Sequence, residues 1–518
     1  MTAGLAGALI LPALLGCQPL HPRDQLVVAS RSSLESVDPV DITSFAGGQL
    51  LSAIGDPLYA SDAAGRLQPR LATALPTLST DGLTARIPLR RGVRFHDGSR
   101  FDAAAMVFSL ERFRALGKLG YLLDDRITAV RASGSHELEL RLKRPYSALA
   151  ALLSSANLTP VSPTAYRRHG RRSLADRFVG TGPYRLVSSS PQKKSLQPFA
   201  DYWGPPPRNR GVHLVTLSNS TALFGALVSG EVDVLLSQGL ESDQQRALAE
   251  RARRGAFVQG IGPAVEIGYL TLLSDRPPLN QAALRRAVAL SLDRRLISER
   301  VSYGMRTPLR SLIPPPLPGA VPPAWPDYDP AQARRLYRQG GYCGGRRLSL
   351  PLTFRSNVPA DRLFALTWQA QLQRDLGDCV QLNLTGVEST TAYRQLDKGA
   401  FPLILLDWAG DYPAPDVFVV PMLACEKAEG PRCLEGGSAL FGSFWSAPGL
   451  QRQLEASESL SGSARTTVLQ SIQRRTAAAA PYIPVWQVAP RAWGQPGLTP
   501  PRFDGSGRVL LQELERQP

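Results

Sequence analysis

The side chains of this 518-residue chain that are suited to catalysis are few and widely separated. The five histidines, His21, His96, His136, His169 and His213, are scattered, so the sequence suggests neither a metal cluster nor an acid–base pair. GxxxxGK[ST], HExxH and GxSxG, the patterns of phosphate loops, zinc proteases and serine hydrolases, do not occur. The sequence therefore proposes no enzyme, no cofactor and no metal site.

One acidic residue has the surroundings of a binding group. Asp411 follows an apolar run at 402–406, which we expect to be a buried strand, and Trp408 and Tyr412 lie beside it. Sheets of α/β proteins present binding groups at the carboxyl ends of their strands. We therefore expect Asp411 to bind a ligand, and Trp408 and Tyr412 to line side-chain pockets. The alternatives are a solvated loop acid and two aromatic residues of the core.

Four cysteines in the second half of the chain allow three disulfide pairings. They are Cys343, Cys379, Cys425 and Cys433. Cys343 and Cys379 each precede an expected strand, and parallel neighbouring strands would bring both to one edge of a sheet, within disulfide reach. Cys425 and Cys433 would close a short loop. We expect the pairs Cys343–Cys379 and Cys425–Cys433. A zinc site is the alternative, but no CxxC pair is present.

The fifth cysteine, Cys17, ends an apolar N-terminal stretch. Residues 3–16 are apolar or small, a length typical of the hydrophobic region of a signal peptide. Leu14-Leu15-Gly16-Cys17 resembles the bacterial lipobox, which implies removal of residues 1–16 as a signal peptide and a membrane anchor of acyl chains on Cys17. No basic residue precedes the apolar run, so either the chain starts upstream or the export signal is weak. An ordinary signal peptide is the alternative.

The composition is that of a globular protein with a basic surface. Hydrophobic residues make up 43% of the chain, and the net charge is +16. Such a charge favours either an anionic partner or a solvated surface. The arginines form short clusters far apart and are not interleaved with aromatic residues, as a nucleic-acid groove requires. We therefore expect solvated helix faces and no nucleic-acid partner.

The elements that must position these side chains follow from hydrophobic periodicity. We expect strands at 25–29, 83–89, 136–142, 212–217 and 232–236, and helices at 103–116 and from Asn219 or Ser220 to Val228. One long helix is expected at 283–303, with Arg285, Arg286, Arg294 and Arg295 on its exposed face. In the later part, strands at 347–354, 380–384 and 402–406 alternate with a helix at 363–376 and a short one from Ser389. This alternation predicts a largely parallel sheet.

Eight stretches, in order, resemble one family of bacterial proteins. They are Val37-Asp38-Pro39, the segment GLTARIPLRRGVRFHDGSRFDAAAMVFSLER at 82–112, FVGTGPY at 178–184, Gly230-Glu231-Val232-Asp233, LRRAVALSLDR at 284–294, Asp329-Pro330-Ala331 with Gly341-Tyr342, WAGDYPAPD at 408–416, and PYIPVW at 481–486. This series resembles the solute-binding proteins of peptide-type ABC importers, the bacterial extracellular solute-binding proteins of family 5.

The resemblance implies an α/β, two-lobed fold of the periplasmic-binding-protein kind (type II, large peptide-binding class), with an additional domain inserted in the first lobe. The expected boundaries are 17–58, 181–266 and 487–518 for the discontinuous first lobe, 59–180 for the insertion, and 267–486 for the second lobe. Ligand would be enclosed as the lobes close. The expected protein is a monomeric lipoprotein outside the cytoplasmic membrane. It would deliver a peptide-like solute to ABC permease subunits, which work with separate ATPase subunits.

The resemblance also assigns roles to two residues. In peptide-binding relatives the acid of the WAGDY-like motif pairs with the α-amino group of the ligand, which carries that role to Asp411. Arg362 loosely matches an arginine that holds the ligand carboxylate in dipeptide-binding relatives; a surface arginine is the alternative. The same fold could bind a nickel chelate, haem, an opine or a sugar instead. A sensor or an enzyme on this fold is the remaining alternative.

Overall fold

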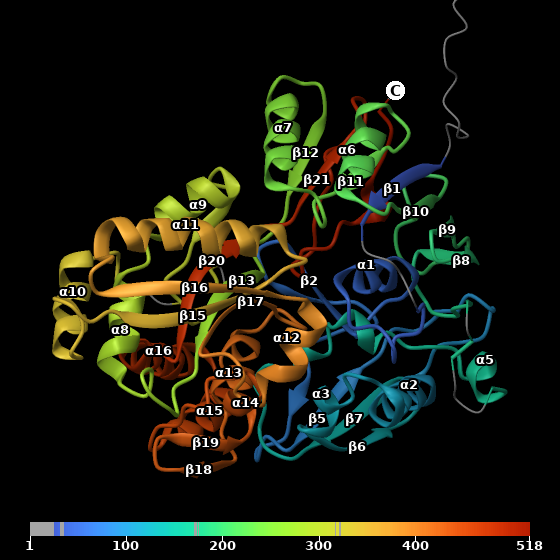
Figure 1. Ribbon diagram of the computed structural model, residues 1–518. Coiled ribbons are helices and arrows are strands. Elements are labelled where there is room, and N and C mark those ends of the chain that lie inside the picture. The colour runs from blue at the N-terminus through green and yellow to red at the C-terminus, as the bar shows by residue number, and fades with distance from the viewer. Residues whose placement is uncertain are drawn as a thin grey trace, which may run out of the picture.

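The computed structural model describes residues 25–31, 36–169, 173–174, 176–315, 317–320 and 323–517. The expected lipidation point, Cys17, lies outside these residues. The described chain forms two α/β lobes and a smaller, β-rich part (Figure 1). We call them lobe I, which holds a seven-stranded sheet, lobe II, which holds a six-stranded sheet, and the inserted subdomain, which lies between β1 and β8 of lobe I in the sequence and holds a four-stranded sheet.

Lobe I is built from both ends and the middle of the chain. Its strands, in sheet order, are β12 (Val258–Ile261), β21 (Arg491–Gly494), β11 (Val234–Leu236), β1 (Leu26–Ser30), β10 (Val212–Thr216), β9 (Lys193–Pro198) and β8 (Tyr184–Ser189). Its main helices are α1 (Phe45–Ile54), α6 (Ser220–Val228) and α7 (Ser242–Arg253). The central strand β1 is parallel to β10 and β11, and β21 is antiparallel to both of its neighbours.

Alternation along β1 explains why both faces of this sheet are covered. Leu26 and Val28 belong to a buried cluster that includes residues of α1 and the C-terminal segment, whereas Val27 and Ala29 belong to a cluster with α6 and α7. Successive strand side chains point to opposite faces, so a wholly apolar strand needs cover on both sides.

The inserted subdomain follows α1 in the sequence. Its sheet has the order β4 (Thr77–Leu78), β5 (Thr84–Pro88), β7 (Glu137–Leu142) and β6 (Ile127–Ala132). The hairpin of β2 (Tyr59–Ser61) and β3 (Leu67–Pro69) and the helices α2 (Ala103–Leu116), α3 (Tyr121–Asp124), α4 (Leu149–Leu152) and α5 (Pro163–Arg167) complete it. A short 3₁₀ helix follows at Ala156–Leu158. The helix α2 has the predicted bounds because the Asp102 carboxylate accepts a hydrogen bond from the Ala105 N–H at its start.

Lobe II contains the remaining large sheet, whose strand order is β14 (Arg306–Pro308), β20 (Tyr482–Val488), β13 (Glu266–Leu272), β17 (Leu403–Ala409), β15 (Leu348–Arg355) and β16 (Val380–Val387). The prediction of a largely parallel sheet holds only for the neighbours β17, β15 and β16, because the other ladders are antiparallel. The β13–β20 ladder is antiparallel because β13 leads the chain into lobe II and β20 leads it back to lobe I.

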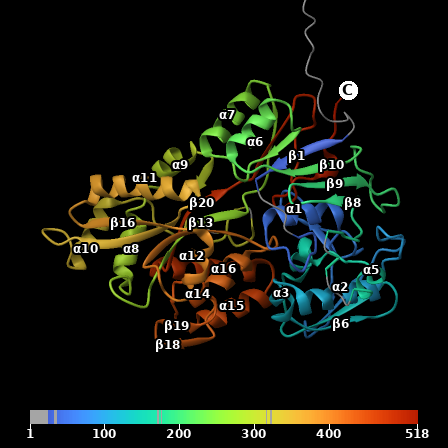
Figure 2. The same cartoon turned by 45° about the vertical axis from the view of Figure 1, so that its right-hand side comes forward.

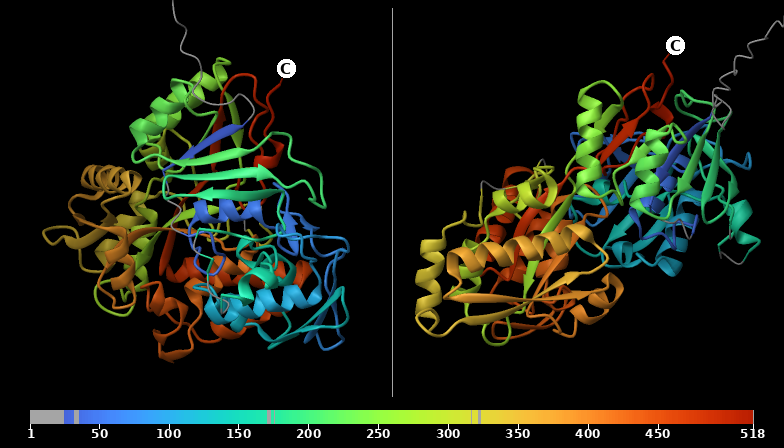
Figure 3. Two further views of the ribbon diagram at one scale, coloured as in Figure 1. Left: turned by 90° about the vertical axis from the view of Figure 1, so that its right-hand side faces the viewer. Right: turned by 45° about the horizontal axis from the view of Figure 1, so that its top comes forward.

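Helices cover both faces and one end of this sheet. They are α8 (Ala282–Leu290), α9 (Arg294–Ser302), α10 (Pro330–Gln339), α11 (Pro359–Leu376), α12 (Ser389–Leu396), α13 (Val420–Leu423), α14 (Gly437–Leu440), α15 (Leu450–Ser459) and α16 (Gly462–Ala479), with short 3₁₀ turns at Pro415–Phe418 and, in lobe I, Leu511–Glu513. Lobe II also contains a small hairpin of β18 (Lys427–Glu429) and β19 (Arg432–Glu435). Figure 3 shows α11 lying across one face of the sheet. None of the described helices is both long and apolar enough to span a membrane.

The single helix expected at 283–303 is wrong, because the chain forms α8 and α9 with a break between them. The Asp293 carboxylate accepts a hydrogen bond from the Leu296 N–H, so Asp293 begins a new helix. The expected exposed arginine face is also wrong for two of its four members. Arg285 and Arg294 are buried, and their guanidinium groups donate to backbone carbonyls, including Ala479 O at 2.6 Å and Pro484 O at 2.7 Å.

Candidate ligand-binding site

The two lobes are joined by two adjacent crossings of the chain. The first crossing leads from β12 in lobe I to β13 in lobe II, and the second leads from β20 back to β21. Because β12 pairs with β21 and β13 pairs with β20, the crossings lie side by side. The Gly262 N–H donates to Pro490 O at 2.8 Å and ties the two together. Such a short double connection is typical of a hinge.

A cavity of about 290 Å³ lies against this hinge and is lined by both lobes. Lobe I contributes Gln238 and Ser242, and lobe II contributes Glu266, Arg306 and Ala409. Burial raises the pKa of Glu266 to about 7, and the negative charge of Asp407 adds to this effect while Arg306 opposes it. A cavity between two lobes, with a few charged and polar side chains in its lining, is the usual place for a small ligand.

Asp411 lies two residues beyond the end of β17, as expected for a group at the carboxyl edge of the sheet. Its half-buried carboxylate makes no hydrogen bond and no ion pair within 4 Å with any described residue. Burial raises the pKa of Asp411 to about 6, and the positive charge of Arg508 in lobe I opposes that rise. The charge of Asp411 also contributes to a raised pKa of Tyr121 in the inserted subdomain. Asp411 therefore lies within electrostatic range of groups in lobe I and in the inserted subdomain.

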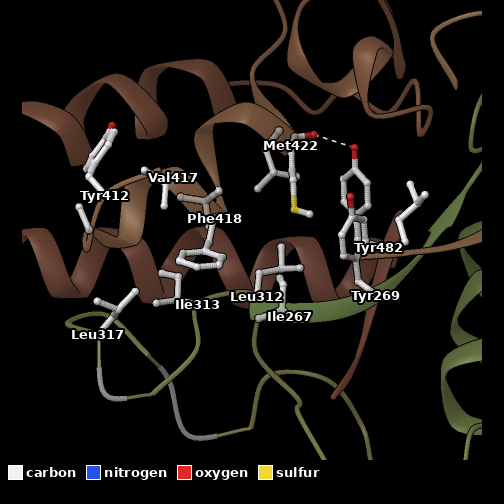
Figure 4. Close-up of a cluster of buried hydrophobic side chains, with 14 of the residues drawn as sticks. Ile267, Tyr269, Leu312, Ile313, Leu317, Tyr412, Val417, Phe418, Met422 and Tyr482 are labelled. Carbon is white, nitrogen blue, oxygen red and sulfur yellow. Dashed lines mark hydrogen bonds between the residues drawn. The ribbon is translucent and has the colours of Figure 1, made fainter. Parts of the chain in front are cut away.

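The two aromatic neighbours of Asp411 are engaged inside lobe II. The Trp408 indole N–H donates to Val417 O at 2.7 Å, and its ring packs edge-on against Phe441. Tyr412 is buried in the same cluster as Val417 and Phe418 (Figure 4). In this arrangement Trp408 and Tyr412 hold the loop that presents Asp411.

Arg362 is exposed on the first turns of α11 and makes no ion pair with a described residue. Sequence reasoning missed a nearby arginine, Arg355, which is buried at the end of β15. Arg355 binds Asp361 at 2.7 Å and both carboxylate oxygens of Asp407 at 2.7 and 2.8 Å. Its place at the carboxyl end of a strand parallel to β17 was the signal that could have identified it.

A buried polar network joins the inserted subdomain to lobe II near Asp411. The Tyr146 hydroxyl lies 2.6 Å from Asp416 Oδ2 and 2.7 Å from the Tyr412 hydroxyl. Asp416 has no exposed side-chain surface and is also bound by Arg465 at 2.6 Å. We call these four residues the Asp416 network. Burial, together with the charge of Asp416, raises the pKa of the Tyr146 hydroxyl well above its usual range.

A second set of contacts runs beside the Asp416 network. Glu458 on α15 binds Arg126 at 3.2 Å and Arg144 at 3.5 Å, and its backbone carbonyl accepts a hydrogen bond from the Ser147 N–H. Figures 1 and 2 both show α15 next to the inserted subdomain. One buried apolar cluster also runs through both parts. The inserted subdomain and lobe II are thus held together over an extensive contact.

The structure contains two disulfides, Cys343–Cys379 and Cys425–Cys433. These are the pairs favoured from the sequence. Cys343 and Cys379 lie just before the paired starts of β15 and β16, where Leu348 is opposite Val380. The one group of metal-binding residue types found in the described chain is Cys343, Asp378 and Cys379, and both of its sulfurs are already bonded to each other.

The sequence matches the model of the bacterial extracellular solute-binding proteins, family 5 Middle, over residues 66–430. Curated relatives include the glutathione-binding protein GsiB of Shigella dysenteriae and of Escherichia coli K12, each 27% identical over 348 residues. These alignments cover 66% of this chain and 66% of each relative, so the chain spans just under two thirds of the length of the curated relatives it matches.

Solved structures share the fold along nearly the whole chain. NikA of Brucella suis in complex with Fe(III)-EDTA has a TM-score of 0.82 at 21% identity, covering 95% of this chain and 100% of that one. The dipeptide-binding protein of Pseudoalteromonas in complex with Met-Leu has a TM-score of 0.79 at 21% identity, with the same coverage. The murein tripeptide-binding protein MppA of Escherichia coli has a TM-score of 0.76 at 19% identity, covering 96% and 99%. The predicted two-lobed fold is therefore confirmed.

Proposed function

Because the chain belongs to the bacterial extracellular solute-binding proteins of family 5, we propose that it is the receptor of an ABC importer. It captures a peptide-like solute between its two lobes and delivers it to the permease subunits in the membrane. It performs no chemistry on the solute, and ATP is hydrolysed by separate subunits. The short hinge and the cavity between the lobes support this function.

The main support for a peptide-like ligand is that the carboxylate of Asp411 has no partner among the described residues. A half-buried carboxylate without a partner among the described residues is unfavourable, as its raised pKa reflects. An ammonium group would supply the missing charge and hydrogen bonds, and charge-assisted bonds of this kind are strong inside a closed cleft. The resemblance of WAGDY at 408–412 to the amine-binding motif of peptide-binding relatives supports the same role. The names of the relatives, which include glutathione-, dipeptide- and tripeptide-binding proteins, are in accord with it.

Lipid attachment at Cys17 is the second part of the proposal and rests on the lipobox-like Leu14-Leu15-Gly16-Cys17 alone. An anchor of this kind would keep the receptor at the outer face of the cytoplasmic membrane or in the periplasm, next to its permease. The remaining site assignments are weaker. Exposed Arg362 could meet a ligand carboxylate only if the ligand extends toward the start of α11.

A thermal-shift screen of the exported protein tests the function. Pools of di- and tripeptides should raise the melting temperature, because a ligand that binds only the folded state stabilises it. A shift with nickel–histidine, haem or a sugar but with no peptide pool would replace the peptide-like ligand by one of those solutes. Mass spectrometry of solute that co-purifies with the protein gives an independent identification.

A further inference from the structure

Arg508 is a cation of lobe I that the proposed function does not yet use. It lies in the C-terminal segment and packs against α1 so closely that a Cβ atom at Gly48 would lie 2.7 Å from both Nε and Nη2 of its guanidinium. A larger residue at position 48 would therefore require the guanidinium to shift from this position. The Arg508 Nε is buried and donates no hydrogen bond to any described residue, and no carboxylate of the described chain lies within 4 Å of the guanidinium.

Arg508 also lines a cavity of about 480 Å³ that is formed by lobe I and the inserted subdomain. The other two arginines of that lining are already paired. Arg70 binds Asp56 at 2.5 Å, and Arg502 binds Glu513 at 2.9 Å. Asp504 of the same lining is close enough for the charge of Arg508 to oppose the raised pKa of its carboxyl, but no ion pair within 4 Å joins the two. Among the described lining residues, Arg508 is thus the arginine without an ion-pair partner. A buried guanidinium without an acceptor is costly, and a carboxylate would supply one.

Asp411 presents the opposite charge from lobe II. Arg508 acts on the Asp411 carboxyl through space, yet no nitrogen of Arg508 lies within 4 Å of its oxygens. Asp411 and Arg508 carry opposite charges on opposite lobes, and neither has an ion-pair partner within 4 Å among the described residues. Such a pair suits a ligand end that carries both an ammonium and a carboxylate. The ammonium would bind Asp411 and the carboxylate would bind Arg508, so that the ligand connects the lobes.

We propose that Asp411 and Arg508 together bind an α-amino-acid head group, in which the ammonium and a free carboxylate share one carbon atom. This inference rests on the proposed function and narrows its ligand class. The preferred solutes are γ-glutamyl-type peptides and other compounds with a free amino-acid end. An ordinary α-linked peptide has an amide where that carboxylate would be, so it satisfies Asp411 but offers Arg508 only a neutral carbonyl oxygen instead of a carboxylate.

Isothermal titration of the exported chain carrying Cys17→Ser tests this with two isomers, γ-Glu-Ala and α-Glu-Ala, and with trialanine. The isomers have the same atoms and the same charge and differ only in linkage. The γ isomer should bind at least about tenfold more tightly. Arg508→Met should reduce that ratio to about one, Arg508→Lys should retain part of it, and the exposed control Arg286→Met should retain all of it. Melting temperatures of the empty variants show whether each one folds.

Equal affinity of the two isomers for the wild-type protein overturns the inference, and so does a preference that survives in Arg508→Met. If trialanine and both isomers bind equally, only this inference fails and the proposed function stands. If none of the three probes binds while another class of solute does, the proposed function fails as well.

Discussion

The Tyr146 hydroxyl of the inserted subdomain lies 2.6 Å from the Asp416 carboxylate of lobe II, in a contact that water does not reach. Asp416 follows Asp411 by five residues, so the contact forms beside the proposed amine-binding group. The inserted subdomain is itself tied to lobe I, because Arg112 on α2 binds both oxygens of Asp38 at 2.8 and 2.6 Å. The inserted subdomain is fixed to lobe I, so the Tyr146–Asp416 contact connects lobe I indirectly to lobe II. We therefore expect this contact to oppose separation of the two lobes.

Tyr146→Phe should shift the protein toward an open state. The change removes one hydrogen bond to a buried carboxylate, an interaction worth about 1.5–3 kcal/mol, while Arg465 and Tyr412 still satisfy Asp416. Small-angle X-ray scattering of the empty protein should give a larger radius of gyration than the wild type. Ligand affinity should fall about tenfold, because less of the protein is in the binding-competent state.

Tyr166→Phe is the matched control for this experiment. Tyr166 is also a buried tyrosine of the inserted subdomain, but it packs against Arg112 and belongs to a buried cluster whose described members lie in lobe I and the inserted subdomain. The radius of gyration and the ligand affinity of the Tyr166→Phe protein should equal those of the wild type. Identical scattering for Tyr146→Phe and the wild type would show that the contact does not control closure.

Asp411→Asn should lose binding of amine-bearing ligands while the empty protein keeps its melting temperature or gains stability. Loss of one partner of a desolvated charge pair costs at least about 2 kcal/mol, so peptide affinity should fall about 30-fold or more. Titration calorimetry measures the affinity, and thermal unfolding measures the stability. Unchanged affinity would remove Asp411 from the binding site.

Peptide affinity should depend on pH with an inflection near 6. The raised pKa of Asp411 means that its charged form is disfavoured in the empty folded protein. An ammonium ligand needs the carboxylate, so affinity should fall about tenfold per pH unit below about 6 and should be constant above it. The stability of the empty protein should show the opposite sign: it should decrease as the pH rises from about 4 to about 6, because the folded state then binds more protons than the unfolded state.

Glu266→Gln tests whether the pH dependence of peptide affinity comes from Asp411 or from Glu266, another acid with a raised pKa. The pKa of Glu266 is about 7, so the variant should lose any change of stability near that pH. The inflection of peptide affinity near pH 6 should remain. An inflection that disappears in Glu266→Gln would assign the titration to the hinge cavity instead of Asp411.

The two disulfides should contribute unequally to stability. The Cys343–Cys379 bridge spans a sequence separation of 36 and the Cys425–Cys433 bridge one of 8. By loop-closure entropy the first should contribute about 4 kcal/mol and the second about 2.5 kcal/mol to the free energy of unfolding. Urea unfolding of the paired serine variants measures this. Peptide mapping without reduction should recover both bridges, and free thiols at all four positions would contradict the pairing.

Cys17→Ser should abolish lipid attachment. Cells labelled with radioactive palmitate should incorporate it into the wild-type protein and not into the variant, which should be released from the membrane fraction. Equal labelling of both proteins would show that Cys17 is not the attachment point.

Helices and strands could be predicted where the residues that determine them, such as a capping side chain, lie close by in the sequence. The helix at 103–116 has its capping acid next to it, and Asn219 caps α6 through a bond to the Ala222 N–H, as expected. The break between α8 and α9 was missed because the apolar spacing continues through it. The burial of Arg294 was missed because it depends on carbonyls that are distant in the sequence, such as Pro484 O.

In the candidate site, too, residues with a local sequence signal could be predicted and residues placed by distant contacts could not. Asp411 could be predicted because it follows an apolar strand and lies in a recognisable motif. Arg355 could have been found by looking for polar residues at the carboxyl ends of strands. It was missed because the expected strand at 347–354 stopped one residue before it. Arg508 has no local signal at all. Its role depends on the packing of the C-terminal segment against α1 and on the approach of a different lobe.

The position of β21 determines the order in which the protein can fold as it is exported. This strand lies between β11 and β12 in the lobe I sheet, although it is made of residues 491–494, close to the end of the chain. Until it arrives, β12 has no neighbour in that sheet. The inserted subdomain can form its sheet while the chain is still emerging. Both lobes must wait for the last part of the chain, because β20 (residues 482–488) also lies inside the lobe II sheet, between β14 and β13. A nascent or C-terminally truncated receptor would therefore present an open sheet edge to chaperones and proteases, and the binding cleft can be completed only after the entire chain has crossed the membrane.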